Sequence, residues 1–322
     1  MKTSTYFLKN CLLVFLFFYF GKTLTAQYDI PLQDTTNQIN FYSGISPVIL
    51  EKDDIEIYMF NSLVSFWDGL YQYSNILNDN VIVDRRRFTS MDNTIRVSYG
   101  FSENKRWDLG ATIQYRQIRL DNDARSSPFR VFEGDSFSGN SERGFSKLGL
   151  QFRWMPIVKV PELTLQSSLN FPIAKNDQLK AELGAQRISF DLNATWFNEF
   201  YAQTYLFFQT GWTTRFKNER RDNSTHHALG SIYLVKRIFN QKVYFFPSLT
   251  YFNSMEQFNS GGRLNQTNYQ LLWGGGIQYQ PNTQISIFAQ FQAPFILESG
   301  SKNSEWIKDS YSAFSLGFRI LI

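Results

Sequence analysis

The sequence has almost no cysteine. Its one cysteine, Cys11, lies within an N-terminal apolar run, so an exported chain that loses this run has no thiol. Disulfide bonds and thiol catalysis are thereby excluded together. Cys11 also stands at the start of the apolar run and not at its end, which is poorly placed for lipoprotein acylation.

Long apolar runs and strong charge are also missing. After the N-terminus, no stretch approaches the roughly 18 apolar residues that a membrane helix requires. A net charge of +4 is too small to argue for a nucleic-acid partner. No glycine-rich phosphate loop is evident either, since Gly274 to Gly276 stand inside a predicted strand, where glycine eases a bend or tight packing. We therefore expect no cofactor and no bound metal.

The N-terminus has the order of segments of a secretory signal peptide. Lys2 and Lys9 form a charged region, residues 11–20 an apolar one, and residues 23–26 a short polar end. We expect residues 1–26 to be the signal peptide, with cleavage after Ala26. The polar residues 27–53 are then a periplasmic N-terminal segment, and a small inward-folded segment is the alternative.

Aromatic residues are abundant, at 17% of the chain, and from residue 54 the sequence alternates apolar and polar residues in short segments. Aromatics favour strands, and membrane barrels carry aromatic girdles at both interfaces. In residues 147–154, for example, Leu148, Leu150, Phe152 and Trp154 alternate with polar residues and glycine. Two segments, 54–66 and 226–238, have apolar residues in both registers, so we assign no facing there. The predicted strands are 54–66, 91–101, 107–120, 145–156, 162–174, 186–197, 200–215, 226–238, 242–254, 268–280, 284–297 and 310–322.

The connections between these segments alternate in length, which is a second and independent pattern. The first, third and later odd-numbered gaps are long or polar, beginning with 67–90 and 121–144, whereas even-numbered gaps such as 198–199 and 281–283 are short. Long outer loops and short periplasmic turns are typical of bacterial outer-membrane barrels. We predict an all-β fold: a transmembrane, antiparallel, up-and-down β-barrel of about 12 strands over residues 54–322.

The segment 310–322 predicts the strand that closes this barrel. Phe314, Leu316, Phe318, Ile320 and Ile322 alternate with Ser315, Gly317, Arg319 and Leu321, so we expect the first set to face lipid and Ser315, Gly317 and Arg319 the lumen. The strand should pair with residues near Glu56 to Phe66.

Residues 315–322 resemble the C-terminal signal by which barrel assembly machinery recognises its clients, with Ile320 and Ile322 where aromatics are usual. With the signal peptide and the loop pattern, the chain resembles bacterial outer-membrane barrels, by length the transporter barrels related to the MetA-pathway of phenol degradation group. The Ala26-Gln27 junction resembles exports of Bacteroidota. The resemblance implies the cell outer membrane as location, and outer-membrane lipid, lipopolysaccharide and the assembly machinery as partners.

If the apolar faces point to lipid, the opposite faces line a lumen. Basic groups outnumber acidic ones there, and basic rings favour anions in a pore. These groups could equally pair across the lumen and only fill it. The candidate lumen residues are Arg96, Asp108, Arg116, Lys147, Arg153, Arg187, Asp191 and Arg319.

Two predicted loops carry further candidates. Arg85, Arg86 and Arg87, in the loop 67–90, could bind a lipopolysaccharide phosphate or an anionic solute, or form an ordinary solvated run. The loop 121–144 contains Arg125, Arg130 and three phenylalanines, and could fold inward as a constriction.

Three functions remain open. The first is a channel or transporter for small polar solutes with a mild anion preference. The second is a structural or surface-interaction barrel with a plugged lumen and functional loops. The weakest is a hydrolase that uses His226 or His227, near Asp222 and Ser224. Adjacent residues of a strand face opposite ways, so at most one histidine could serve, and Ala228 and Leu229 follow where the phospholipase pattern has a serine two residues after its histidine.

Overall fold

The computed structural model describes residues 49–74, 79–133, 141–157, 159–175, 187–201, 203–217, 224–238, 242–257, 264–299 and 311–322. The predicted signal peptide and most of the segment 27–53 lie outside these residues. Within the described ranges, no helix is long and apolar enough to cross a membrane.

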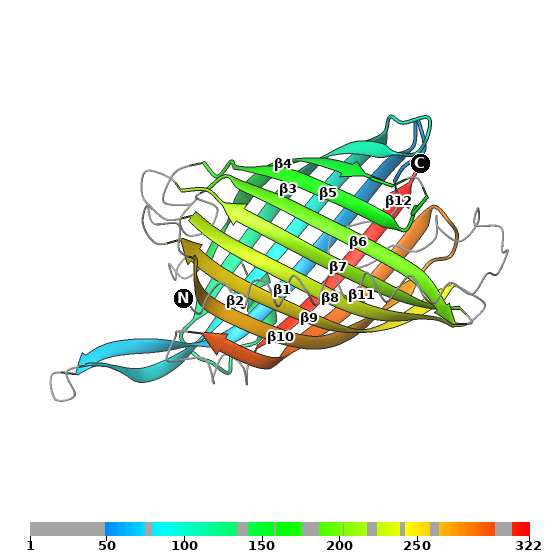
Figure 1. Ribbon diagram of the computed structural model, residues 1–322. Coiled ribbons are helices and arrows are strands. Elements are labelled where there is room, and N and C mark those ends of the chain that lie inside the picture. Colours follow the sequence, from blue (N-terminus) through cyan, green and yellow to red (C-terminus); the bar gives the residue numbers. More distant parts are fainter. Residues whose placement is uncertain are drawn as a thin grey trace, which may run out of the picture. The chain divides into compact units, whose positions relative to one another are not determined.

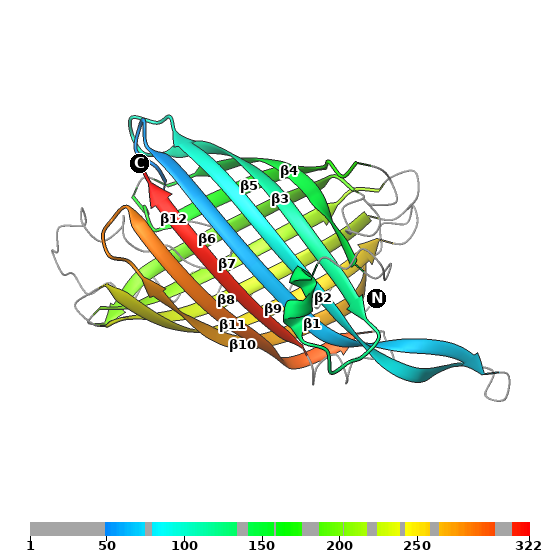
Figure 2. The same ribbon diagram turned by 180° about the vertical axis from the view of Figure 1, so that it is seen from behind.

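Twelve antiparallel strands form one closed barrel, as the strand pattern predicts (Figures 1 and 2). Each strand pairs with its neighbours in the sequence, and β12 returns to pair with β1. The strands are β1 (Ile55–Ser74), β2 (Asp79–Gly100), β3 (Trp107–Asp121), β4 (Ser141–Trp154), β5 (Leu163–Pro172), β6 (Ser189–Tyr201), β7 (Thr204–Arg215), β8 (Ser224–Ile238), β9 (Val243–Gln257), β10 (Leu264–Tyr279), β11 (Ile285–Ser299) and β12 (Ser312–Leu321).

The seam lies where the closing-strand pattern predicts it. Glu56 is opposite Leu321 and Ser65 is opposite Ser312, with an unbroken register between them. Backbone hydrogen bonds of 2.9 Å in each direction join Ile55 and Ile322. Closure matters because an unpaired strand edge would leave backbone groups without partners in a membrane.

The outer face of the barrel is apolar. Leu148, Leu150, Phe152 and Trp154 on β4 are between 38% and 59% exposed, and Phe314 and Leu316 on β12 are 45% exposed. Gly317 and Arg319 on the opposite face of β12 are buried. Exposed apolar side chains over such a surface are what a lipid-facing band requires, and the predicted facing of both strands is correct.

The two ends of the barrel differ. One end, here called the short-turn end, carries the start of β1, the end of β12 and the connections 101–106, 155–162, 202–203, 239–242 and 280–284. Tyr99, Phe101 and Trp107 form an aromatic row at this end, with ring centroids 4.6 and 5.6 Å apart. The opposite end is here called the long-loop end.

The predicted loop 67–90 is wrong: β1 and β2 continue far beyond the barrel rim as a hairpin (Figures 1 and 2). Their registers are continuous from Ile55–Tyr99 to Ser74–Asp79, apart from one irregularity at Leu70/Tyr71. The rings of Phe66 and Phe88 lie 4.9 Å apart and support the extension. Residues 67–90 lack the regular apolar-polar alternation of the membrane strands, so the sequence pattern does not identify them as strand.

The described part of the second long loop packs on the outer side of the barrel (Figure 2), not inside it as the constriction hypothesis requires. Its 3₁₀ helix η2 (Pro128–Phe132) lies against β2 and β3, with Val131 4% exposed. Arg87 donates from Nε to the Ala124 carbonyl at 2.9 Å, and Arg119 from Nη1 to the Arg130 carbonyl at 3.0 Å. These strands present polar groups above the lipid band, and the loop satisfies them.

The residues just before β1 pack against the short-turn end. Leu50 is 1% exposed, and its backbone N–H donates to Oδ2 of Asp108 at 3.2 Å. Asp53 and Gly100 are joined by a backbone hydrogen bond of 2.9 Å. A Cβ at position 100 would lie 1.7 Å from the Glu51 carbonyl oxygen, so only glycine allows this close approach.

Candidate functional site in the barrel interior

A buried cluster of charges occupies one side of the interior near the short-turn end. Glu56 on β1 is its centre: Arg319 Nε lies 2.7 Å from Oε2, and Arg96 Nη2 and Arg153 Nη1 lie 3.2 and 3.1 Å from Oε1. Arg153 Nε also lies 2.7 Å from Oδ1 of Asp108. Each of the five side chains is at most 3% exposed. Three guanidinium groups and two carboxylates therefore neutralise most of one another's charge.

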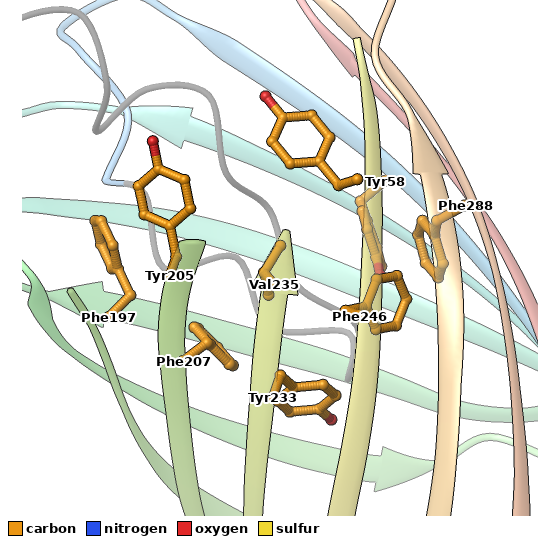
Figure 3. Close-up of a cluster of buried hydrophobic side chains, with 9 residues drawn as sticks. Tyr58, Phe197, Tyr205, Phe207, Tyr233, Val235, Phe246 and Phe288 are labelled. Carbon is orange, nitrogen blue, oxygen red and sulfur yellow. The ribbon is translucent and has the colours of Figure 1, made fainter. Parts of the chain in front are cut away.

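An aromatic cluster lines the other side of the interior at the same height, as the strand registers require. Figure 3 shows its side chains together. Its side chains point into the barrel from β6 to β9 and from β11, and Tyr58 on β1 joins it to the charged cluster. The Arg96 guanidinium lies 4.6 Å from the centre of the Tyr58 ring, a cation–π contact. The members are Tyr58, Phe197, Tyr205, Phe207, Tyr233, Val235, Tyr244, Phe246 and Phe288.

Together the two clusters form what we call the charged-aromatic layer. Every cluster member is at most 6% exposed, so at this height the described side chains leave little contact with solvent. A layer of buried glutamines follows toward the long-loop end, with Gln151, Gln166, Gln209 and Gln290 between 1% and 6% exposed. The half of the interior near the short-turn end is thus closely packed.

The half near the long-loop end is different, because its charged side chains are partly exposed. Arg116 on β3, Lys147 on β4, Arg187 just before β6 and Arg215 on β7 all point inward, as their registers require. Arg116 pairs with Asp92, with Nη2 2.9 Å from Oδ2. Arg187 donates to the Thr225 hydroxyl at 2.9 Å. We call these four cations the basic layer.

Asp191, the second carboxylate at this height, is held by neutral donors. Thr213 donates to its Oδ1 at 2.6 Å, and Asn170 and Ser168 donate to Oδ2 at 2.6 and 3.1 Å. Lys147 and Arg215 form no hydrogen bond or ion pair of 4.0 Å or less with another described residue. Among the residues that the structure describes, their positive charges are therefore less compensated than those of the charged-aromatic layer.

The sequence-predicted lumen residues divide between these two layers. Arg96, Asp108, Arg153 and Arg319 lie in the buried charged cluster, where they pair with one another and with Glu56. Arg116, Lys147, Arg187 and Asp191 lie in or beside the basic layer. The two alternatives for the interior charges, cross-lumen pairing and an exposed basic lining, thus hold at different heights of one barrel.

Arg85, Arg86 and Arg87 are strand residues of β2, not loop residues, because the hairpin extends through them. The Arg87 guanidinium donates to Ser65 Oγ at 3.1 Å as well as to the Ala124 carbonyl, so it helps to attach the outer loop to the barrel. No described contact bears on anion binding by this run.

The two histidines face opposite sides, as predicted. His226 faces outward, where Nε2 lies 3.1 Å from Ser224 Oγ and Nδ1 lies 3.1 Å from the Thr214 hydroxyl. His227 faces inward, with Nδ1 2.9 Å from Ser254 Oγ and its ring stacked on Phe252 at 5.5 Å. Within the described residues, no group of three or more His, Cys, Asp or Glu side chains could hold a metal ion.

Glu56, Arg215 and the aromatic cluster were not among the sequence candidates. Glu56 and Tyr58 lie in the segment 54–66, and Tyr233 and Val235 in 226–238, the two segments with apolar residues in both registers. A strand that is apolar on both faces has one face toward lipid and the other in a packed interior. That signal could have located the packed half of the barrel.

Comparison with solved structures identifies the fold. An outer-membrane channel from Pseudomonas putida F1 superposes with a TM-score of 0.58 at 11% identity, over 88% of this chain and 100% of that one. The β domain of the Bordetella autotransporter BrkA superposes with a TM-score of 0.51 at 12% identity, over 84% of this chain and 100% of that one. No protein-family model and no curated protein matches the sequence. At such low identities the likeness establishes the fold alone: a twelve-stranded barrel of the outer-membrane type.

Proposed function

We propose that this protein is an outer-membrane channel for small polar solutes, with a mild preference for anions. In this proposal the long-loop end is extracellular and the short-turn end periplasmic, as in barrels with short inner turns. The observation that carries it is the basic layer of four inward-facing, partly exposed cations, of which Lys147 and Arg215 form no ion pair with Asp92 or Asp191. A low-dielectric wall strengthens their field, which raises the local concentration of anions.

The charged-aromatic layer supports the view that passage is gated. Solutes would reach the basic layer from outside and cross the packed half only when aromatic side chains move. The similar barrel from Pseudomonas putida F1 is an outer-membrane channel, which supports the same general role. In the same proposal, residues 1–26 direct export and residues 315–322 bind the barrel assembly machinery. Lipopolysaccharide surrounds the long-loop end of the barrel.

Planar-bilayer recording of the purified, folded protein tests the channel. We expect ion current with a reversal potential that indicates anion preference, and loss of part of that preference in Arg116→Gln. Arg143→Gln on the exposed outer face of β4 is the matched control and should leave selectivity unchanged.

The packed interior also favours the second candidate, a plugged structural barrel. The two are separated by recording a variant in which the aromatic cluster is thinned, such as Tyr233→Ala with Phe246→Ala. Folded protein that carries no current in either form would eliminate the channel.

A further inference from the structure

Two cations of the basic layer, Lys147 and Arg215, have no hydrogen-bond or ion-pair partner among the described residues, and both lie on one wall of the interior. They project from β4 and β7, with β5 and β6 between them. Lys147 is within electrostatic range of Arg116, Arg215, Asp92 and Asp191, and Arg215 is within range of Arg116, Arg187 and Asp191. All four cations therefore act on one region.

Neither Asp92 nor Asp191 forms an ion pair with Lys147 or Arg215. Asp92 pairs bidentately with Arg116, at 2.5 and 2.9 Å. Both oxygens of Asp191 accept hydrogen bonds from neutral side chains. A partly buried cation without a counter-ion is unfavourable, because desolvation is not offset by a partner. An anion from solution would supply such a partner, and hydrogen bonds to charged donors are stronger than neutral ones.

The opposite wall is of another kind. With the strand tilt of a barrel, the registers bring inward-facing residues of β1 and of β9 to β12 to the height of Lys147. Among the described side chains there, none is charged, and Leu272 and Ala313 are each 7% exposed. The uncharged wall consists of Val64, Phe252, Leu272, Pro294 and Ala313.

We propose that this height of the barrel is a binding site for small organic anions, with the carboxylate or phosphate of the solute on Lys147 and Arg215. The apolar body of the solute contacts the partly exposed members of the uncharged wall, Val64 and Phe252. An inorganic anion would contact only the wall with Lys147 and Arg215, and an uncharged solute would contact only the uncharged wall. The site refines the proposed channel by naming its solute class and rests on that function for its physiological meaning.

Calorimetric titration of the folded full chain in detergent tests the site without requiring conduction. The probes are butyrate, which has both parts, inorganic phosphate, which has only the charge, and 1-butanol, which has only the apolar body. We expect butyrate to bind most tightly. Lys147→Gln and Arg215→Gln should each weaken butyrate about tenfold, the loss of one hydrogen bond to a charged donor. Lys147→Arg should retain binding.

Arg143→Gln removes the same charge from the outer face of β4 and is the control. Equal weakening in this variant would overturn the site, because it would indicate a general charge effect. The site is also overturned if butyrate binds no better than phosphate or butanol, or if no probe binds. Butyrate binding without any bilayer current would sustain the site and reject the channel.

Discussion

Arg319, near the end of the last strand, donates from Nε to Oε2 of Glu56, near the start of the first strand, at 2.7 Å. Glu56 also lies 3.2 Å from Arg96 and 3.1 Å from Arg153. The central carboxylate of the charged-aromatic layer therefore bridges the seam of the barrel. Seam closure and interior packing depend on one residue.

Glu56→Gln should destabilise the barrel. The change leaves three buried guanidinium groups with only the Asp108 carboxylate, and breaking a buried pair costs about 3–5 kcal/mol. We expect a lower urea midpoint, measured by the gel mobility of unboiled samples. Glu103→Gln, which breaks the exposed 2.9 Å pair with Lys52, is the control and should have almost no effect. Equal midpoints for Glu56→Gln and the wild type would refute this account.

Gly317→Ala should also disturb the barrel near the seam, because residue 317 on β12 packs against the aromatic cluster. A Cβ at position 317 would lie 1.8 Å from Cζ of Phe288, whose ring is 4% exposed and stacked against Tyr58 at 6.0 Å. The ring cannot withdraw without disturbing the cluster, so we expect a loss of about 1–3 kcal/mol in unfolding free energy.

Gly230→Ala on β8 is the matched control for this prediction, since a Cβ there meets nothing within 4 Å. The double variant Gly317→Ala with Phe288→Leu should recover part of the loss. If Gly230→Ala destabilises the barrel as much as Gly317→Ala, the loss reflects strand propensity and not the clash with Phe288.

The fold could be predicted from sequence because lipid imposes a simple rule. Every membrane strand must show an apolar outer face, so the alternation in segments such as 147–154 identifies strands and their facing directly. The rule stops applying outside the lipid. Residues 86–90 and 124–131 meet other strands or a docked loop, and both sequences resemble loops although β2 extends through the first.

The interior was harder to predict because two arrangements satisfy the same residue types. Arg96 and Arg116 both stand at inward-facing positions of their strands. Arg96 is 2% exposed within the five-residue charged cluster, whereas Arg116 is partly exposed beside Asp92. Which occurs depends on height within the barrel and on partners such as Glu56, far away in the sequence. Strand registers, not residue types, decide it.

Val131→Asp should release the outer loop from β2 and β3. Val131 is 4% exposed, and a buried carboxylate there would have to be solvated by undocking η2. We expect trypsin to cleave faster after Arg125 or Arg130, measured by mass spectrometry of the folded protein, with the barrel's urea midpoint unchanged. Phe129→Asp, two residues away at a side chain that is 67% exposed, should not accelerate cleavage. Similar acceleration in both variants would argue against docking through Val131.

Tyr233→Ala should open the packed half of the interior. Tyr233 is 2% exposed, and its ring lies 5.4 Å from Phe207 and 6.3 Å from Phe246, so truncation removes the side chain that joins these two. In planar bilayers we expect a larger or more frequently open conductance than in the wild type. Ile232→Ala, the adjacent residue on the outer face at 39% exposure, controls for general loosening of β8 and should leave conductance unchanged. A Tyr233→Ala barrel that is folded but no more conductive than the wild type would place the barrier to passage elsewhere than in the charged-aromatic layer.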